Sequence, residues 1–247
     1  MSKNENKDTN FGFKKVNKDK KPKMVKGVFD SVAENYDLMN DIMSLGIHRV
    51  WKRRLIDWMN PQLNENLIDV ASGTGDIAKL FTKKINSANK ICCVEPNNEM
   101  YFAGKENLKN FKNITWFKAK AEKLPFQNDT FDFYTISYGI RNVSDINLTL
   151  KEALRVLKPG GRFMCLEFSK VNNEMINFLY QSYSRTIPFI GKYIVGSAKP
   201  YDYLIRSIDH FYSQNELVNL MKQNGFYSIE YRNLSNGISA IHSGWKI

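Results

Sequence analysis

The sequence predicts an α/β fold: a doubly wound, mostly parallel sheet of seven strands, with N-terminal helices and a helical cap insertion. Two observations support it. Short apolar runs alternate with helix-like stretches between residues 66 and 167, the order typical of parallel strands joined by helices. A turn of small residues at 71–75 follows the first run and opens a helix, as in nucleoside-binding βαβ units.

The first 26 residues form a basic segment, with nine lysines against three acidic residues in a chain of formal net charge +11. Because the segment is poor in apolar residues, we expect it to be disordered and to precede a single domain at 27–247. Two functions stay open for it, attraction to an anionic membrane surface and simple solubilisation. Nucleic-acid binding is disfavoured, because the basic residues are not interleaved with aromatic ones.

Residues 27–60 carry apolar residues at helical spacing, which predicts N-terminal helices with a break near Gly46. Strand-like runs follow at 66–70, 90–95, 114–118, 131–137 and 162–167, separated by helix-like stretches at 75–85, 97–108 and 144–157. The motif LKPGGR at 157–162 contains the Pro and Gly of a turn between the last of these helices and its strand.

Residues 172–210 interrupt this alternation. They are helical in pattern but rich in Tyr, Phe, Ile and Pro, so we expect an insertion that caps the ligand-binding edge. Ser213 and Glu216 have the spacing of a capping box, which predicts a helix that ends at about Gly225. Two strand-like runs then flank the turn signal at 235–237, as in a closing hairpin.

Several classes of protein are disfavoured. No apolar run reaches the roughly 18–20 residues of a membrane span, and the first residues lack the apolar core of a signal peptide. We therefore expect a cytoplasmic protein. The cysteines Cys92, Cys93 and Cys165 have no metal-like spacing, so we expect no metal site and read them as buried small residues in a reducing compartment.

The turn alone does not identify the cofactor, because Gly73, Gly75 and Ala78 also fit a dinucleotide fingerprint. Asp69, four residues before Gly73, suits a ligand that carries an ammonium group. Together with KAKAEKLPFQNDTFDFYTIS (118–137) and LKPGGR, these features resemble class I S-adenosylmethionine-dependent methyltransferases. The resemblance implies a Rossmann-like methyltransferase fold and S-adenosylmethionine as the cofactor.

Two longer segments, 28–53 and 131–170, resemble the ubiquinone/menaquinone biosynthesis C-methyltransferase family, particularly through SYGIRNV at 137–143. The similarity extends to the C-terminal NLSNGISAIHSGWKI and leaves only the basic N-terminus outside. It implies methylation of a ring carbon of a polyprenylated benzoquinol, a naphthoquinol or both.

The resemblance also implies a cofactor site, formed by Tyr36, Gly73, Thr74, Gly75, Glu95, Lys120, Ala121 and Ser137. In it the glycine turn and Tyr36 hold the methionine part, Glu95 the ribose hydroxyls, and Ala121 the adenine edge. Glu95 stands where the family usually has Asp, and Lys120 where it often has Asn. Other roles stay open for these residues. Gly73 and Gly75 could form an ordinary tight turn, and Glu95 could be an acid that stabilises the N-terminus of the following helix. Ser137 and Tyr36 could serve only in packing.

The chemistry requires a group that stabilises a developing phenolate. Arg141, just past the fourth strand, is the candidate, with Asn142 as its helper. An arginine stays protonated at neutral pH and therefore cannot act as the base. The alternative role for Arg141 is a surface salt bridge. His210 in the cap is the candidate base. His48 and His242 have less support, and Asp209, a bound water or positioning alone are alternatives.

A polyprenyl tail partitions into lipid, so we expect peripheral association with the inner membrane surface, through the apolar cap and its basic residues. The aromatic residues of the cap could equally fill an ordinary core. Two further associations stay open: a complex with other quinone-biosynthesis enzymes, and an oligomer of this chain. Two other functions compete, methylation of an RNA or a small phenol and a noncatalytic scaffold.

Overall fold

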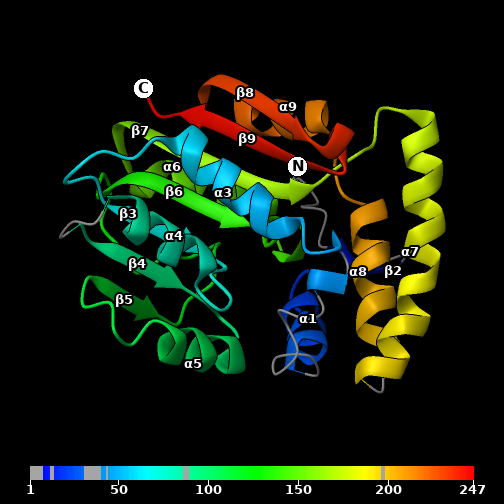
Figure 1. Ribbon diagram of the computed structural model, residues 1–247. Coiled ribbons are helices and arrows are strands. Elements are labelled where there is room, and N and C mark those ends of the chain that lie inside the picture. The colour runs from blue at the N-terminus through cyan, green and yellow to red at the C-terminus, as the bar shows by residue number, and fades with distance from the viewer. Residues whose placement is uncertain (1–7, 12–13, 31–39, 43, 86–88, 196–197) are drawn as a thin grey trace, which may run out of the picture.

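The computed structural model describes residues 8–11, 14–30, 40–42, 44–85, 89–195 and 198–247 (Figure 1). Its centre is a sheet of seven strands in the order β5-β4-β3-β6-β7-β9-β8. The strands are β3 (Leu67–Val70), β4 (Ile91–Val94), β5 (Ile114–Phe117), β6 (Phe131–Ser137), β7 (Leu157–Phe168), β8 (Tyr227–Leu234) and β9 (Ser239–Trp245). The first five run parallel, and β9 is antiparallel to both of its neighbours, which confirms the predicted doubly wound sheet.

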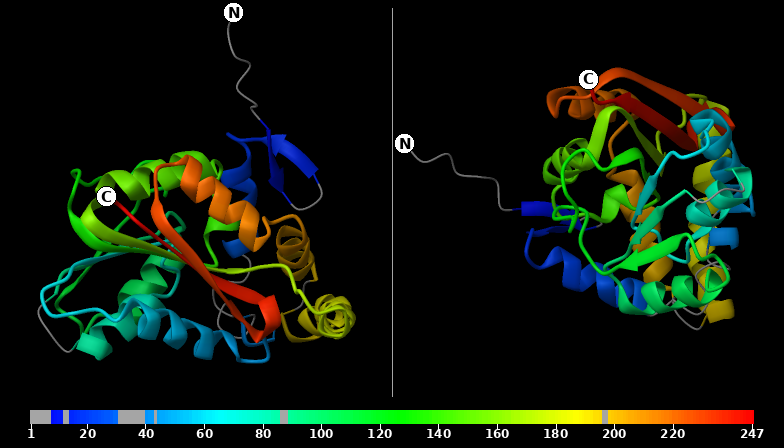
Figure 2. Two further views of the ribbon diagram at one scale, coloured as in Figure 1. Left: turned by 90° about the horizontal axis from the view of Figure 1, so that it is seen from above. Right: turned by 90° about the vertical axis from the view of Figure 1, so that its left-hand side faces the viewer.

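Helices cover both faces of this sheet (Figures 1 and 2). They are α3 (His48–Met59), α4 (Asp76–Ile85), α5 (Asn98–Asn107), α6 (Ile146–Val156) and α9 (Gln214–Gln223). One apolar core lies between the sheet and α3 and α4, and a second between the sheet and α6 and α9. Since β3 is buried along its whole length, both of its faces are covered, which explains why Leu67, Ile68 and Val70 are all apolar.

Local sequence signals account for several boundaries. Ser213 and Glu216 form the predicted capping box at the start of α9. Gly46, with φ of 75°, lies in the turn before α3, where the helical pattern was expected to break. The hairpin β8–β9 turns through η3 (Ser235–Gly237) as predicted. The motif LKPGGR differs from its prediction, because it already belongs to β7 and pairs with the C-terminal strand through Gly160 and Gly161.

The prediction of a disordered segment at 1–26 is wrong for its described part. Strands β1 (Asp8–Phe11) and β2 (Lys14–Asn17) form an antiparallel hairpin, and α1 (Lys21–Asp30) begins before residue 27. Contacts distant in sequence hold them: Lys18 pairs with Asp145 at 2.6 Å, and Lys21 Nζ donates to the Arg141 carbonyl at 3.1 Å. A composition rich in lysine does not reveal such contacts.

The expected cap consists of two helices, α7 (Glu174–Val195) and α8 (Lys199–Asp209). Figure 1 shows both, with α1, at the edge toward which the arrowheads of β3, β4 and β6 point. Ligands of doubly wound sheets bind at this carboxyl edge. The cap therefore lies where a substrate would approach.

Candidate cofactor and acceptor site

The turn after β3 is held in a backbone conformation that suits a close ligand. Ala71, Gly73 and Gly75 all have positive φ, of 53°, 56° and 88°. Ser72 anchors the turn to β4, because its N–H donates to the Val94 carbonyl and its hydroxyl accepts from the Val94 N–H. Positive φ at the non-glycine Ala71 is strained, and such strain gathers at functional sites.

Glu95 follows β4 and faces this turn. Its Oε2 accepts from Gly73 N at 2.9 Å and its Oε1 from Asn97 N at 2.8 Å. Burial raises the pKa of Glu95 to about 7, although both hydrogen bonds oppose the rise. An ionised carboxylate has about four acceptor positions, so Glu95 retains capacity for two ligand hydroxyls.

A cavity of about 320 Å³ opens beside Glu95. We call it the cofactor cavity; of the predicted site residues it is lined by Gly73, Glu95, Lys120, Ala121, Ser137 and Asn142. Ser137 Oγ is buried and has no hydrogen-bond partner among the described residues. The cavity therefore offers acceptors for ribose hydroxyls, an unsatisfied hydroxyl and apolar walls from Val70 and Met100, which together fit an adenosine-bearing ligand such as S-adenosylmethionine.

Two other predicted cofactor residues lie beside the cavity without lining it. Thr74 is buried in the turn, and a side chain at Gly75 would meet Leu108 and Trp116. Tyr36 lies outside the described residues. Asp69 does not line the cavity either. Its Oδ1 accepts from the Thr135 hydroxyl at 2.7 Å, its Oδ2 is buried without a hydrogen-bond partner among the described residues, and burial raises its pKa to about 7.

Helix α1 supplies a wall of the cofactor cavity that sequence reasoning missed. Pro22, Val25 and Lys26 line it, and the Asn97 side chain donates to Asp30 at 2.8 Å. This hydrogen bond ties the end of α1 to the loop that carries Glu95. Residues 21–26 of this helix were expected to belong to the basic tail, whereas its last residues fall within the predicted N-terminal helices.

Arg141 is buried in an ion pair rather than exposed on the surface. Its guanidinium pairs with the buried Glu167 of β7 and also donates to the Tyr138 carbonyl at 2.9 Å and to Ser207 Oγ at 3.3 Å. Burial raises the pKa of Glu167, and the Arg141 charge opposes that rise. Sequence reasoning missed Glu167, although an acid inside the apolar run FMCLEF was a usable signal.

Asn142 connects the cofactor cavity to the cap. Its side chain lines the cavity, and its Oδ1 accepts from the Tyr203 hydroxyl of α8 at 2.9 Å. Tyr203 in turn lines a second cavity, together with Arg141 and Ser207. The predicted pair Arg141 and Asn142 therefore lies on the boundary between the two cavities.

None of the three histidines lines the cofactor cavity, so none is placed there for acid–base chemistry. His210 ends α8, where its Nδ1 lies 3.1 Å from the Arg206 carbonyl, and it lines the second cavity rather than the cofactor cavity. Burial lowers the pKa of His48 and of His242 to about 4, so both stay neutral at physiological pH. Within the described chain, no cluster of His, Cys, Asp or Glu could hold a metal ion.

Sequence comparison relates this chain to known methyltransferases. Residues 14–246 match the model of the ubiE/COQ5 methyltransferase family. Among curated proteins, the ubiquinone/menaquinone biosynthesis C-methyltransferase UbiE of Rickettsia bellii is 50% identical, over 97% of this chain and 99% of that protein. The protein of the same name from Rickettsia prowazekii is 49% identical over the same shares.

Solved structures show the same fold at low identity. A structure described as a SAM-dependent methyltransferase and possible histamine N-methyltransferase from Thermotoga maritima has a TM-score of 0.66 at 21% identity, covering 90% of this chain and all of that one. A phosphoethanolamine N-methyltransferase 2 from Haemonchus contortus has a TM-score of 0.60 at 12% identity, covering 89% of this chain and 60% of that one.

Proposed function

This chain belongs to the ubiE/COQ5 methyltransferase family, and on that premise we propose that it transfers a methyl group from S-adenosylmethionine to a ring carbon of a polyprenylated quinol. The acceptor is a demethylmenaquinol, a 2-polyprenyl-6-methoxy-1,4-benzoquinol or both. The observation that supports this most directly is the cofactor cavity itself, in which Glu95, Ser137 and Asn142 meet at the carboxyl edge of the sheet, next to the cap.

Bound S-adenosylmethionine supplies an electrophilic methyl group on a positively charged sulfur. Glu95 fixes its ribose through the acceptor positions that Gly73 and Asn97 leave open. The glycine turn supplies backbone close to the ligand without side chains in the way. This part of the proposal assigns binding and orientation to the chain and leaves the reactivity to the cofactor.

The acceptor must become electron-rich at carbon. A ring hydroxyl would give up its proton to water, and the ring carbon would take the methyl group as the bond between that methyl group and the sulfur breaks, with S-adenosylhomocysteine as the leaving group. The ring carbon would then lose its hydrogen as a proton, and the ring oxygen would regain one. Asn142, held by Tyr203, is the side chain of the predicted pair that reaches the cofactor cavity. In this proposal it orients the ring oxygen, and the Arg141 charge stabilises the phenolate from behind it.

His210 keeps a narrower role. Because it lines the second cavity, a proton from the acceptor would reach it through Tyr203 or ordered water rather than directly. Positioning of the quinol against the methyl group supplies much of the rate in such a reaction, so the proposal does not depend on a strong base.

The described part of the chain holds no helix that is both long and apolar enough to cross a membrane. We propose peripheral contact instead, through α7. This helix exposes large apolar side chains along its length: Met175, Phe178, Leu179, Phe189 and Tyr193. The exposed Arg185 and Lys192 lie on the same helix and suit anionic headgroups.

On α8, by contrast, Tyr201, Leu204 and Ile208 are buried in the core, the ordinary role that was open for the cap.

The test is methyl transfer from labelled S-adenosylmethionine to a reduced, short-tailed demethylmenaquinol and to the matching methoxy-benzoquinol. Turnover of either supports the proposal, and the ratio of the two rates assigns the substrate. Equal turnover of a tail-free phenol would favour a methyltransferase of other substrates. Binding of S-adenosylmethionine without turnover of any acceptor would favour the scaffold.

A further inference from the structure

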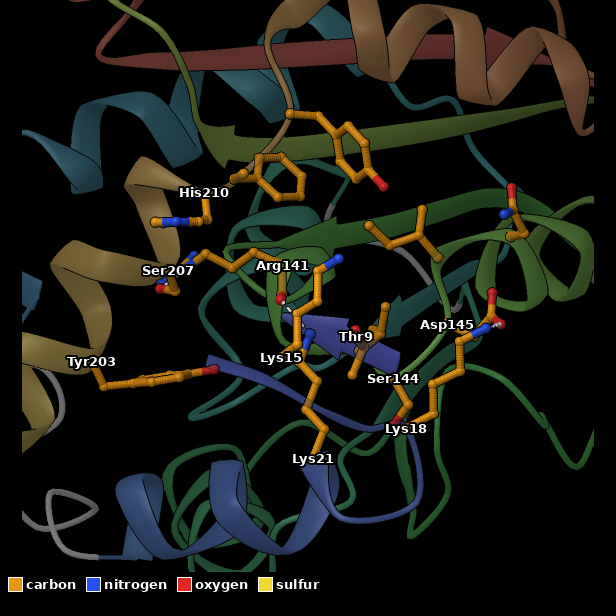
Figure 3. Close-up of a pocket in the computed structure, with 15 residues that line it drawn as sticks. Thr9, Lys15, Lys18, Lys21, Arg141, Ser144, Asp145, Tyr203, Ser207 and His210 are labelled. Atoms are coloured by element: carbon orange, nitrogen blue, oxygen red, sulfur yellow. Dashed lines mark hydrogen bonds and ion pairs between the residues drawn. The ribbon is translucent and has the colours of Figure 1, made fainter. Parts of the chain in front are cut away.

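The second cavity, which we call the basic cavity, has a volume of about 430 Å³. It lies between the hairpin β1–β2, the start of α1, the segment from η2 (Ile140–Asn142) to α6, and α8 (Figure 3). Its charged lining consists of Lys15, Lys18, Lys21, Arg141 and Asp145. The proposed methyl transfer uses Arg141 from this set and leaves the three lysines without a role.

Two of the four cations in the lining already have an acidic partner. Lys18 Nζ lies 2.6 Å from Asp145 Oδ2, and Arg141 pairs with Glu167 behind the cavity wall. Lys15 and Lys21 form no ion pair with any residue that the structure describes. The lining therefore carries two positive charges that the described protein does not neutralise.

Lys21 is the more unusual of these two. It is only 4% exposed, and its Nζ donates to the Arg141 carbonyl rather than to a carboxylate. Burial lowers the pKa of Lys21 to about 8, a fall that the charge of nearby Glu122 partly opposes. A buried ammonium without an ion-pair partner is costly to the fold, and an anion bound in the cavity would remove that cost.

We propose that the basic cavity binds a dianionic phosphate group between Lys15 and Lys21. A phosphate monoester carries about −1.5 to −2 charges at neutral pH and three acceptor oxygens, which matches two ammonium groups that have no ion-pair partner among the described residues. The hydroxyls of Thr9 and Ser144 line the same cavity and supply further donors. The ligand is either a soluble phosphate ester or a lipid headgroup that ends in a phosphate, and this site goes beyond the proposed methyl transfer.

The position of the site links it to the cofactor cavity. Val143 and Ser144 line both cavities, and α1 begins at Lys21 and continues along the cofactor cavity with Pro22 and Val25. A phosphate held by Lys15 and Lys21 would connect the hairpin to the first turn of α1. The bound anion would thereby fix the wall that α1 contributes to the cofactor cavity.

The first experiment titrates the full chain with inorganic phosphate and with glycerol 3-phosphate at constant ionic strength, by calorimetry and by thermal melting. We expect saturable one-to-one binding and a rise in the melting temperature. Lys21→Met and Lys15→Met should each weaken binding about tenfold or more, because each removes a charge-assisted contact. The matched control is Lys20→Met, which removes the same charge at an exposed neighbour outside the cavity and should change binding less than twofold.

The second experiment separates the two sources of phosphate. Phosphatidylcholine vesicles are doped either with phosphatidic acid, a monoester, or with phosphatidylglycerol, a singly charged diester. A preference for phosphatidic acid that Lys21→Met abolishes identifies a headgroup, whereas binding of glycerol 3-phosphate without that preference identifies a soluble ligand. The proposal is overturned if neither form binds, or if Lys20→Met weakens binding as much as Lys21→Met, because the attraction is then only that of net charge.

Discussion

The Glu95 carboxylate accepts a hydrogen bond from the backbone N–H of Gly73 at 2.9 Å, so the acid after one strand directly contacts the glycine turn after its neighbour. The acid that we propose to bind the ribose is therefore fixed against the turn, and burial raises its pKa to about 7. The affinity of the site for its cofactor should therefore depend on pH.

Glu95→Gln should weaken S-adenosylmethionine binding about tenfold or more, because ribose hydroxyls donate more strongly to a carboxylate than to an amide. In the unchanged protein, affinity should fall as the pH drops below about 7, where Glu95 takes up a proton. The variant should lose that pH dependence. Calorimetry between about pH 5.5 and about pH 8.5 measures both effects. Glu99→Gln, at an exposed acid in the first turn of α5, is the control; equal loss in both variants would remove Glu95 from the site.

The same residue should make the ligand-free protein less stable as the pH rises. Its pKa is raised from 4.5 to about 7, so its contribution to stability is fully present below 4.5 and is lost as the pH rises through 7. We compare the free energy of unfolding of Glu95→Gln with that of the unchanged protein. The difference, variant minus unchanged protein, should increase by on the order of 3 kcal/mol between pH 4.5 and about pH 7. Urea denaturation in the absence of S-adenosylmethionine tests this, and a flat difference would contradict the burial of an ionisable Glu95.

Arg141→Met should destabilise the protein by about 3–5 kcal/mol, because it leaves the buried Glu167 without its partner. The double variant Arg141→Met with Glu167→Gln removes both charges and should recover most of that loss. If Arg141 also stabilises the phenolate, as proposed, the recovered fold should still lack activity. Thermal melts and the quinol assay, run on the same samples, separate the two roles. Activity in the stable double variant would leave Arg141 with a structural role alone.

The parallel sheet was predictable because its signals are local. The run at 131–137 matches β6 at both ends, and the capping box at Ser213 fixes the start of α9. The family resemblance placed Glu95 and Ser137 in the cofactor site, and both line the cofactor cavity, where each directly follows or ends a strand of the parallel sheet. Periodicity and turn chemistry act over a few residues, and the sequence displays them directly.

The parts that were missed depend on contacts between distant residues. Lys21 bonds to Arg141 across 120 positions, and Arg141 pairs with Glu167 across 26. A lysine-rich segment has the composition of a solvated tail until such partners are known. The wall that α1 adds to the cofactor cavity, and the ion pair that holds Arg141, could not be derived from spacing for this reason.

Gly104→Ala should disturb the glycine turn after β3, because Gly104 of α5 packs against that turn. A methyl group there would lie 2.2 Å from the Trp116 ring and 2.8 Å from the Gly73 carbonyl, so α5 must move away from the turn. We expect a loss of about 1–3 kcal/mol in stability and weaker S-adenosylmethionine binding. The control is Gly27→Ala in α1, where a methyl group meets nothing within 4 Å and helix propensity should improve. Unchanged binding in Gly104→Ala would show that the turn tolerates a shift of α5.

Phe178→Ser should reduce binding to anionic vesicles, because Phe178 is 71% exposed beside the exposed Met175 and Leu179 of α7. Phe102→Ser is the matched control: Phe102 is 59% exposed but lies on α5, away from the proposed contact. Serine in place of an inserted phenylalanine loses about 2 kcal/mol or more of apolar transfer, so the vesicle-bound fraction should fall severalfold. Sedimentation with vesicles measures that fraction, and turnover of a short-tailed quinol in solution should be the same in both variants. If Phe102→Ser lowers vesicle binding equally, or if neither variant does, α7 is not the membrane-facing surface and its apolar face must serve another contact.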